Sequence, residues 1–262
     1  MPVDNVIDAL RELGIRTPKD SLQALFEHAT KTKASPVETC EQLVAVERRE
    51  RDARNLRART QQATLGKFKP LALFDWNHPR SIDRHLYEQL LTLDFVNAGN
   101  NVLLRGPSGV GKTNLAQILG QTALERGCTV RLSTLADALA DLLKQESLPA
   151  LDRRMRRYTA PDLLILDELG YLPCDNHAAD LLYNVISRRH ENRATVITTN
   201  LSFKQWSTVF PGAACVVALV DRFAQHCHTM DIDADSWRQT HAQTQTSAEP
   251  SAKNARRKPR RR

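Results

Sequence analysis

The spacing of apolar residues changes near residue 80. Before that point apolar side chains recur every three to four positions, as in Val3, Ile7 and Leu10, which is typical of amphipathic helices. Residues 1–65 are therefore predicted to form a small all-helical domain. Beyond residue 80, short apolar runs alternate with helical patterns, which favours an α/β fold with a mostly parallel sheet flanked by helices.

The expected strands of the α/β domain are short, and most are followed by a helical stretch. Strands are predicted at residues 101–105, 129–132, 163–166, 195–198 and 229–232. Helices are predicted at 81–98, 112–126, 134–145, 149–157, 176–191, 202–209 and 213–225. Residues 66–80 contain several aromatic side chains and two prolines, and we interpret them as a linker whose aromatic residues pack on the domain that follows.

Two helix starts in the N-terminal domain carry capping signals. Thr17 precedes Pro18, and Ser35 is followed three residues later by Glu38. A hydroxyl residue before a proline at the first helical position marks a helix start, and Ser-x-x-Glu forms a capping box. We therefore expect helices that begin with Thr17 and Ser35 as their N-caps.

Basic charge is concentrated in two segments. The chain has 37 Lys and Arg against 30 Asp and Glu, a net charge of +7. Residues 253–262 hold seven basic side chains and no acid, so residues 241–262 are interpreted as a disordered basic tail. Residues 47–69 hold eight basic and three acidic side chains, so this surface is either solvated or in contact with a polyanion such as DNA. The candidate DNA contacts are Arg48, Arg49, Arg51, Arg54, Arg57, Arg59, Lys67 and Lys69.

A glycine-rich loop lies between a predicted strand and a predicted helix. It matches the phosphate-binding pattern G-x-x-x-x-G-K-[ST] with Gly106, Pro107, Ser108, Gly109, Val110, Gly111, Lys112 and Thr113. Glycine lets backbone N–H groups turn toward phosphate oxygens, and the following helix directs its positive end at them. We expect Lys112 to reach the β- and γ-phosphates of a nucleotide and Thr113 to bind Mg²⁺.

Polar residues follow two later strands. The apolar run 163–166 leads directly into Asp167 and Glu168. Asp167 is predicted to hold Mg²⁺ through water, and Glu168 is predicted to activate a water molecule against the γ-phosphate. Asn200 follows the strand at 195–198 and could contact that water, although a polar residue at a strand end is also ordinary turn chemistry.

The order of these motifs resembles that of the IstB-like AAA+ ATPases, which are helpers of insertion-sequence transposases and are related to DnaC-type helicase loaders. The segments that carry the resemblance are GPSGVGKT, LLILDELGYLP, VITTNLSFKQW and VVALVDRF. The resemblance covers residues 66–238 and implies an AAA+ domain of the ASCE P-loop type, predicted at 81–240. It also implies ATP and Mg²⁺ as cofactors, a homo-oligomer with ATP sites at subunit interfaces, and double-stranded DNA and a transposase as partners.

The resemblance also assigns single residues. It makes Asn200 the first sensor and Arg222 an arginine finger that acts on the ATP of a neighbouring subunit. Arg188 and Arg189 are alternative fingers, and for each of these arginines a surface salt bridge is the alternative role. About 40 residues follow Arg222, so we expect no C-terminal helical lid, and Arg238 is the nearby candidate for a second sensor.

Three functions are compatible with such a core. The first is a transposition helper that assembles on DNA, and the alternative is a DnaC-like loader of a replicative helicase, which would differ in its N-terminal domain and partner. A small-molecule kinase would need a substrate pocket and a lid that the sequence does not show.

No apolar run approaches the roughly 20 residues of a membrane helix, the N-terminus does not resemble a signal peptide, and the five cysteines are widely spaced. We therefore expect a protein of the bacterial cytoplasm with no membrane partner.

Overall fold

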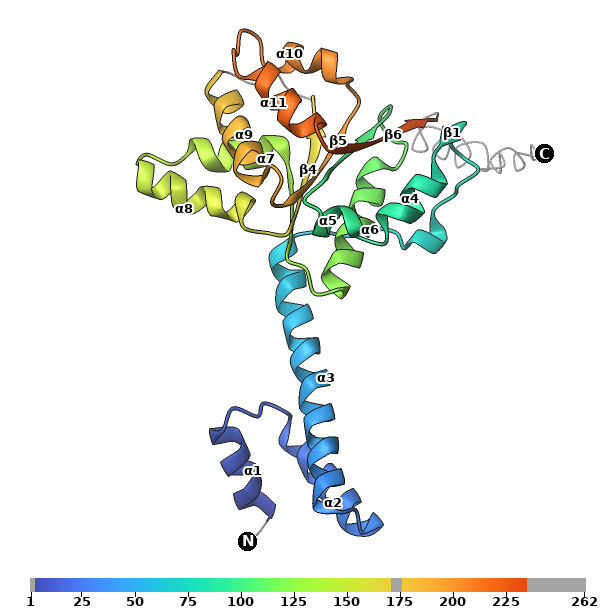
Figure 1. Cartoon of the computed structure of the whole chain (residues 1–262), viewed down its shortest axis with the longest axis vertical. Coiled ribbons are helices and arrows are strands. Elements are labelled where there is room, and N and C mark those ends of the chain that lie inside the picture. The colour runs from blue at the N-terminus through green and yellow to red at the C-terminus, as the bar shows by residue number, and fades with distance from the viewer. Residues whose placement is uncertain (1–2, 171–175, 235–262) are drawn as a thin grey trace, which may run out of the picture. The chain divides into compact units, whose positions relative to one another are not determined.

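The computed structural model describes residues 3–170 and 176–234 (Figure 1). The chain forms two compact units, residues 1–62 and 63–262, and each is described by itself. The predicted basic tail and Arg238 lie outside the described residues, and so does the part beyond residue 234 of the region expected to lack a lid. The domain limits proposed at 65, 80 and 240 stay predictions.

The N-terminal unit is built from three helices. They are α1 (Val3–Glu12), α2 (Lys19–Thr32) and α3 (Pro36–Ala63), the last of which ends at the first residue of the second unit. Ile7 of α1 is buried, and so are Leu22 and Leu25 of α2, as their helical spacing predicts. The Ser35–Glu38 capping box is confirmed, because Ser35 N–H donates to the Glu38 carboxylate at 2.7 Å and Glu38 N–H donates to Ser35 Oγ at 3.2 Å.

The expectation that Thr17 caps α2 is wrong. Pro18 occupies the N-cap position, and the Thr17 hydroxyl donates instead to Glu47 Oε2 at 2.8 Å. Glu47 is only 5% exposed, and a buried carboxylate must be supplied with hydrogen-bond donors. The backbone N–H groups of Arg16 and Thr17 and the guanidinium of Arg54 supply the others. The Thr17 hydroxyl therefore serves as a donor to Glu47, 30 residues later in the sequence, and does not cap α2.

A six-stranded sheet forms the centre of the second unit, with the order β1-β6-β2-β5-β4-β3. Its strands are β1 (Ser81–Ile82), β2 (Asn101–Arg105), β3 (Val130–Thr134), β4 (Leu163–Leu169), β5 (Ala194–Thr199) and β6 (Cys227–Asp233). Five of them are parallel, as predicted, and β1 pairs antiparallel with β6. Because β2, β5 and β4 are adjacent and parallel, their carboxyl ends meet at one edge of the sheet.

The helices of the second unit follow the predicted order. They are α4 (Arg84–Leu90), α5 (Asp94–Asn97), α6 (Lys112–Glu125), α7 (Leu135–Leu143), α8 (Leu148–Thr159), α9 (Asn176–Arg189), α10 (Trp206–Val209) and α11 (Val216–Ala224), with short 3-10 turns η1 (Leu71–Leu73) and η2 (Phe203–Gln205). The segment predicted as one helix at 202–209 is thus a 3-10 turn followed by α10, and the helix predicted from residue 213 begins at Val216.

The single helix predicted at 81–98 is also wrong. Ser81 and Ile82 pair with β6 as a short strand, and α4 begins only after Asp83, whose carboxylate accepts the Leu86 N–H at 2.8 Å. Leu93 adopts a left-handed conformation with φ of 67°, which separates α4 from α5. The apolar spacing was therefore compatible with one helix, but strand pairing and a turn residue divide it.

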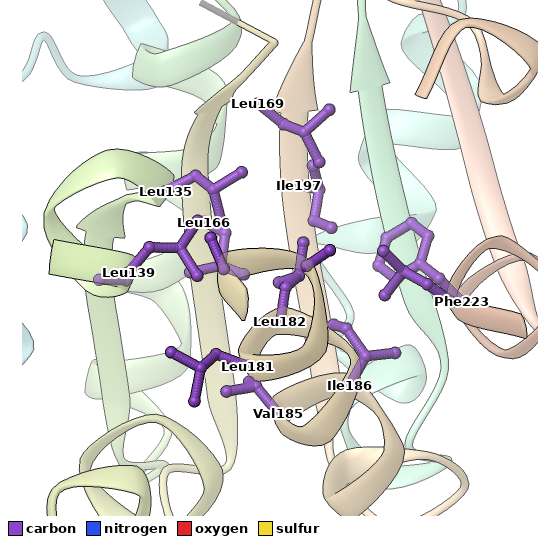
Figure 2. Close-up of a cluster of buried hydrophobic side chains, with 14 of the residues drawn as sticks. Leu135, Leu139, Leu166, Leu169, Leu181, Leu182, Val185, Ile186, Ile197 and Phe223 are labelled. Atoms are coloured by element: carbon purple, nitrogen blue, oxygen red, sulfur yellow. The ribbon is translucent and has the colours of Figure 1, made fainter. Parts of the chain in front are cut away.

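Helices cover both faces of the sheet (Figure 1). On one face Leu164 and Leu166 of β4 join the large core cluster formed with α7, α8, α9, α10 and α11. Figure 2 shows this cluster, with Leu182 and Ile186 of α9 among its labelled side chains. Ile165, between the two leucines, points to the other face, where it approaches α6 at Gly120. Burial on both faces explains why β4 is apolar at consecutive positions.

Candidate nucleotide-binding site

The loop between β2 and α6 is shaped so that two of its glycines cannot be replaced without strain. A Cβ on Gly106 would lie 2.3 Å from the carbonyl oxygen of Ile232. Gly111 has φ of 95°, and a Cβ there would lie 2.9 Å from the Phe74 ring. Glycine at these two positions thus allows the tightly packed loop conformation in which backbone N–H groups can surround a phosphate.

Lys112 lies inside this loop. Its side chain is largely buried, and its Nζ donates to the carbonyl oxygens of Gly106 at 2.7 Å and Pro107 at 2.6 Å. The ammonium group is therefore held against the loop by hydrogen bonds that phosphate oxygens can replace. This is the position expected for the lysine of a phosphate-binding loop.

Thr113 and Asp167 are brought together from two elements 54 residues apart. The Thr113 hydroxyl lies 3.0 Å from both carboxylate oxygens of Asp167, which is 5% exposed, and the Thr198 hydroxyl of β5 also donates to Asp167. Hydroxyl and carboxylate oxygens are the protein ligands that Mg²⁺ prefers. The residues present therefore fit a magnesium ion bound beside the loop.

Glu168 sits in an irregularity of β4. The strand pairing shifts between Leu166 and Leu169, and Glu168 adopts φ of 65°, which is unusual for a residue other than glycine. Its N–H donates to Thr198 Oγ1 at 3.0 Å. The bulge gives the two consecutive carboxylates different surroundings, because Asp167 is buried beside Thr113 while Glu168 is exposed and lines a cavity.

That cavity has a volume of about 590 Å³, which is in the usual size range for a small-molecule ligand. The loop residues Ser108 to Thr113 line one side of it, and Thr198 and Thr199 line the end of β5. The opposite wall comes from the segment at 67–79 and includes Lys67, Phe68, Lys69, Phe74, His78 and Pro79. The aromatic side chains of this wall, Phe68 and Phe74, are suited to a nucleotide base, and its two lysines are suited to phosphate.

Two carboxamides of α6 that belong to none of the motifs in the sequence fasten this wall and the residues just before it. Asn114 makes both of its hydrogen bonds to the backbone of Lys69, with Oδ1 accepting the N–H at 2.7 Å and Nδ2 donating to the carbonyl at 3.1 Å. Gln117 Nε2 donates to the carbonyl of Leu65 at 2.6 Å. We name Asn114 and Gln117 the α6 clasp. Their spacing of three residues on the predicted helix was the available signal, because it puts both side chains on one face.

The remaining predicted catalytic residues lie elsewhere. Asn200 is exposed and is not among the residues that line the cavity, whereas Thr198 and Thr199 are. The Arg222 guanidinium of α11 lies over the Tyr183 ring, 5.0 Å from its centre. Arg188 forms an ion pair with Asp152 at 2.7 Å. The roles of Asn200 and Arg222 stay predictions.

Arg189 has a structural role. It is 1% exposed, and it donates to Thr195 Oγ1 and to five backbone carbonyls, those of Tyr158, Thr159, Pro161, Asp162 and Ala194. Burial lowers the pKa of its guanidinium to about 9, which still leaves it positively charged at neutral pH. A side chain enclosed in this way cannot extend to a neighbouring subunit, so Arg189 is removed from the candidate fingers.

The predicted DNA contacts fall into three groups. Arg48, Arg49, Arg51 and Arg57 are exposed on α3. Arg54 is tied to Glu47 Oε1 and to the carbonyl of Arg16, and Arg59 is half-buried. Lys67 and Lys69 line the cavity, where their charge also suits a nucleotide phosphate. As DNA contacts, all eight stay predictions.

Solved structures share the fold of the second unit. The crystal structure of DnaI aligns with a TM-score of 0.53 and 19% identity over 64% of this chain and 92% of that chain. Domain III of the replication initiation protein DnaA from Thermotoga maritima aligns with a TM-score of 0.50 and 19% identity over 71% and 79%. At this identity the likeness concerns the fold. The fold and the loop together define a protein of the AAA+ fold with a phosphate-binding loop.

Sequence relatives narrow the class to a family. A family model described as IstB-like ATP binding protein matches residues 9–245. The protein assigned as ATP-binding in insertion sequence IS21 of Pseudomonas aeruginosa is 34% identical over 83% of this chain and 82% of its own length. The corresponding protein of IS5376 from Geobacillus stearothermophilus is 31% identical over 82% and 86%. The chain belongs to the IstB-like ATP-binding proteins, and the predicted resemblance and AAA+ fold class are confirmed.

In the part of the chain that the structure describes, no helix combines the length and the apolar character needed to cross a membrane.

Proposed function

We propose that this protein hydrolyses ATP as a homo-oligomer assembled on double-stranded DNA and that it assists a transposase in selecting and using a target site. The observation that carries the ATPase part is the pair Asp167 and Glu168, one buried against Thr113 and the other facing the cavity. The transposition part is supported by family membership, because the relatives are named as proteins of insertion sequences.

The loop residues and Lys112 would hold the phosphates of ATP through backbone N–H groups and the ammonium. Thr113 and Asp167 would hold Mg²⁺, which when bound supplies positive charge beside the β- and γ-phosphates. Lys67 and Lys69 are exposed at the cavity wall and add positive charge there. These groups bind the substrate and fix the position of its terminal phosphate.

Glu168 would act as the general base. Its carboxylate lines the cavity on the exposed side of the bulge, so it can accept a proton from a water molecule that attacks the γ-phosphate. Asn200 is proposed to sense the γ-phosphate, and Arg222 to stabilise transition-state charge on the ATP of an adjacent subunit, as arginine fingers do. Hydrolysis would then depend on assembly and would time the lifetime of the assembled state.

The proposed DNA contact uses the exposed arginines of α3, Arg48, Arg49, Arg51 and Arg57, which offer positive charge without a requirement for base sequence. Binding of this kind suits a protein that must accept many target sites. The proposed location is the bacterial cytoplasm, where DNA, ATP and a transposase are all accessible.

Partner identity separates this proposal from a DnaC-like helicase loader, because both would use the same ATPase core. The Glu168→Gln protein loaded with ATP would be immobilised and offered purified transposase from the same insertion sequence and the replicative helicase of the host. We expect the transposase to be retained with ATP, and the Lys112→Ala protein to retain neither partner. Retention of the helicase without the transposase would contradict the proposal.

A further inference from the structure

Helix α8 presents a second basic surface, in the ATPase unit. Arg153, Arg156 and Arg157 are all exposed and lie at positions i, i+3 and i+4, which places them on one side of the helix. We name these three residues the α8 basic face. The opposite side holds Met155 and Tyr158, each 2% exposed.

Nearby carboxylates neutralise this face only in part. Asp152 is held by Arg188 at 2.7 Å and lies 3.7 Å from Arg156, which is 76% exposed. The Arg188 ion pair is the largest cause that keeps the pKa of Asp152 below its usual value, so Asp152 has a partner without Arg156. Arg153 makes no ion pair or hydrogen bond within the described part of the chain. Exposed ion pairs contribute little to stability, so these arginines can exchange their contacts for phosphate at small cost.

The helix that carries the face is held by other groups. The Tyr158 hydroxyl donates to Asp141 at 2.7 Å. The buried Arg189 donates to the carbonyls of Tyr158 and Thr159 at the end of α8, which would otherwise lack partners. The position of the α8 basic face is thus fixed by residues that do not belong to it.

We propose that the α8 basic face binds the phosphate backbone of double-stranded DNA, as a contact of the ATPase unit in addition to the arginines of α3. The inference deepens the proposed function and rests on it. Arginine suits this role because its planar guanidinium offers paired donors to phosphate oxygens. A membrane surface fits less well, because a membrane-bound helix needs an exposed apolar side, and in α8 the residues Met155 and Tyr158 of that side are buried in the core.

The test compares two double variants of the full chain that remove the same charge. Arg153→Gln with Arg156→Gln changes the α8 basic face, while Arg126→Gln with Lys204→Gln changes two exposed basic residues outside it. DNA affinity would be measured with ATP and Mg²⁺ over a range of salt concentrations. Each lost phosphate contact should reduce the slope of log K against log[salt] by about 0.9, so we expect a reduction of about 2 for the α8 variant and a slope close to that of the wild type for the control.

An unchanged slope for the α8 variant, in a wild type that binds DNA, would overturn this inference and leave the proposed function standing. A wild type that fails to bind DNA would instead contradict the proposed function. Unchanged affinity for a fluorescent ATP analogue shows that the variant is folded. If the double variant does not fold, the single variant Arg153→Gln replaces it, because this change breaks no contact of the described structure. It should reduce the slope of log K against log[salt] by about 1. Loss of binding to anionic lipid vesicles without any effect on DNA binding would also overturn the inference.

Discussion

Glu168 occupies a backbone conformation that a strand residue normally avoids, and it does so beside the cavity. Its φ of 65° costs energy, of the order of 1–3 kcal/mol for such residues, and strain of this kind persists where surrounding contacts enforce it. The contact here is the hydrogen bond from its N–H to Thr198. The same threonine hydroxyl donates to Asp167, so one side chain fixes the arrangement of both carboxylates.

The first prediction concerns the general base. Glu168→Gln should keep ATP affinity within about twofold and reduce hydrolysis by about 100-fold or more, because the amide cannot accept the proton of the attacking water. Phosphate release and binding of a fluorescent ATP analogue measure the two effects. Glu191→Gln is the matched control, because Glu191 is also an exposed glutamate with positive φ, 58°, and lies outside the cavity. Equal hydrolysis by both variants would remove Glu168 as the base.

The second prediction concerns the α6 clasp. Asn114→Ala removes two hydrogen bonds to the Lys69 backbone, worth about 1 kcal/mol each, and should loosen the wall at 67–79. We expect ATP affinity to fall by about tenfold and kcat to stay nearly unchanged, because the Asn114 carboxamide is used to hold the wall and is assigned no part in the proton transfer. Gln121→Ala is the control, because among the residues that the structure describes the Gln121 side chain bonds only to Glu125 of its own helix. A fall in kcat with unchanged affinity would contradict the role of the clasp.

At the scale of elements, α3 is joined to the rest of the N-terminal unit through Glu47 as well as through apolar contacts. Burial alone would raise the pKa of Glu47, but the hydrogen bonds from Thr17, Arg16 and Arg54 outweigh burial and hold the pKa below its usual value. A carboxylate whose pKa is lowered by folding stabilises the fold above its unfolded pKa, near 4.3, and this stabilisation is lost as pH falls toward the folded pKa.

The third prediction follows from that lowered pKa. Glu47→Gln should reduce the free energy of unfolding of the N-terminal unit by about 1–3 kcal/mol at pH 7, because the donors around position 47 lose a charged acceptor. As the pH falls below 5, the free energy of unfolding of the variant should also decrease less than that of the wild type. Hydrogen exchange of residues 3–62 measures both effects, and Glu41→Gln, at an exposed position of the same helix, is the control. A wild type and a Glu47→Gln variant with equal acid sensitivity would exclude the linkage.

Elements whose determinants are local were predictable from the sequence. The phosphate loop and the apolar strand before Asp167 carry their signals within about ten residues, and the capping box at Ser35 needs only four. Thr17 was mispredicted because its partner is 30 residues away. The break after Ile82 depends on pairing with β6, about 150 residues later in the chain. These contacts are properties of the folded topology, and no local pattern contains them.

In the candidate site, too, residues with local sequence signals were predicted, and features that depend on distant contacts were not. Lys112, Thr113, Asp167 and Glu168 were predicted, and the structure brings them to one edge of the sheet because β2, β5 and β4 are adjacent. The packing of aromatic residues from segment 66–80 on the following domain was predicted, and the Trp76 ring lies 5.7 Å from the Tyr87 ring of α4. That the same segment walls the cavity could not be predicted, because its backbone is held there by the Asn114 side chain of α6. Lys67 and Lys69 therefore had only their charge as a signal, and charge alone does not distinguish a nucleotide from DNA.

At the scale of the whole molecule, Arg222 is the residue whose proposed role needs a second subunit. Its side chain is half-buried, and its guanidinium lies over the Tyr183 ring of the same chain, a cation–π contact worth about 0.5–2 kcal/mol. That small contribution lets the side chain turn toward a phosphate of a neighbouring subunit. Under the proposed function, this movement of Arg222 would make hydrolysis dependent on assembly.

The fourth prediction tests this dependence by mixing inactive proteins. Glu168→Gln binds ATP but lacks the proposed base, and Arg222→Ala lacks the proposed finger, so hydrolysis should fall by about 100-fold or more in the first and by about 1000-fold in the second. An equal mixture should recover a substantial part of the wild-type rate, because the base of the Arg222→Ala subunits then meets the finger of the Glu168→Gln subunits. Arg188→Ala, which within the described residues breaks only the ion pair with Asp152, should hydrolyse normally. A mixture as inactive as its components, or an active Arg222→Ala protein, would exclude the assignment of Arg222.

The central claim is that ATP controls assembly on DNA, and it is tested most directly by DNA affinity in different nucleotide states. Binding of the full chain to double-stranded DNA would be measured with ATP and Mg²⁺, with ADP and Mg²⁺, and without nucleotide, between 50 and 200 mM salt. We predict the tightest binding with ATP, and a loss of about 1000-fold or more across that salt range if six or more phosphates are contacted. An affinity that is the same in all three nucleotide states and does not change with salt would contradict the account.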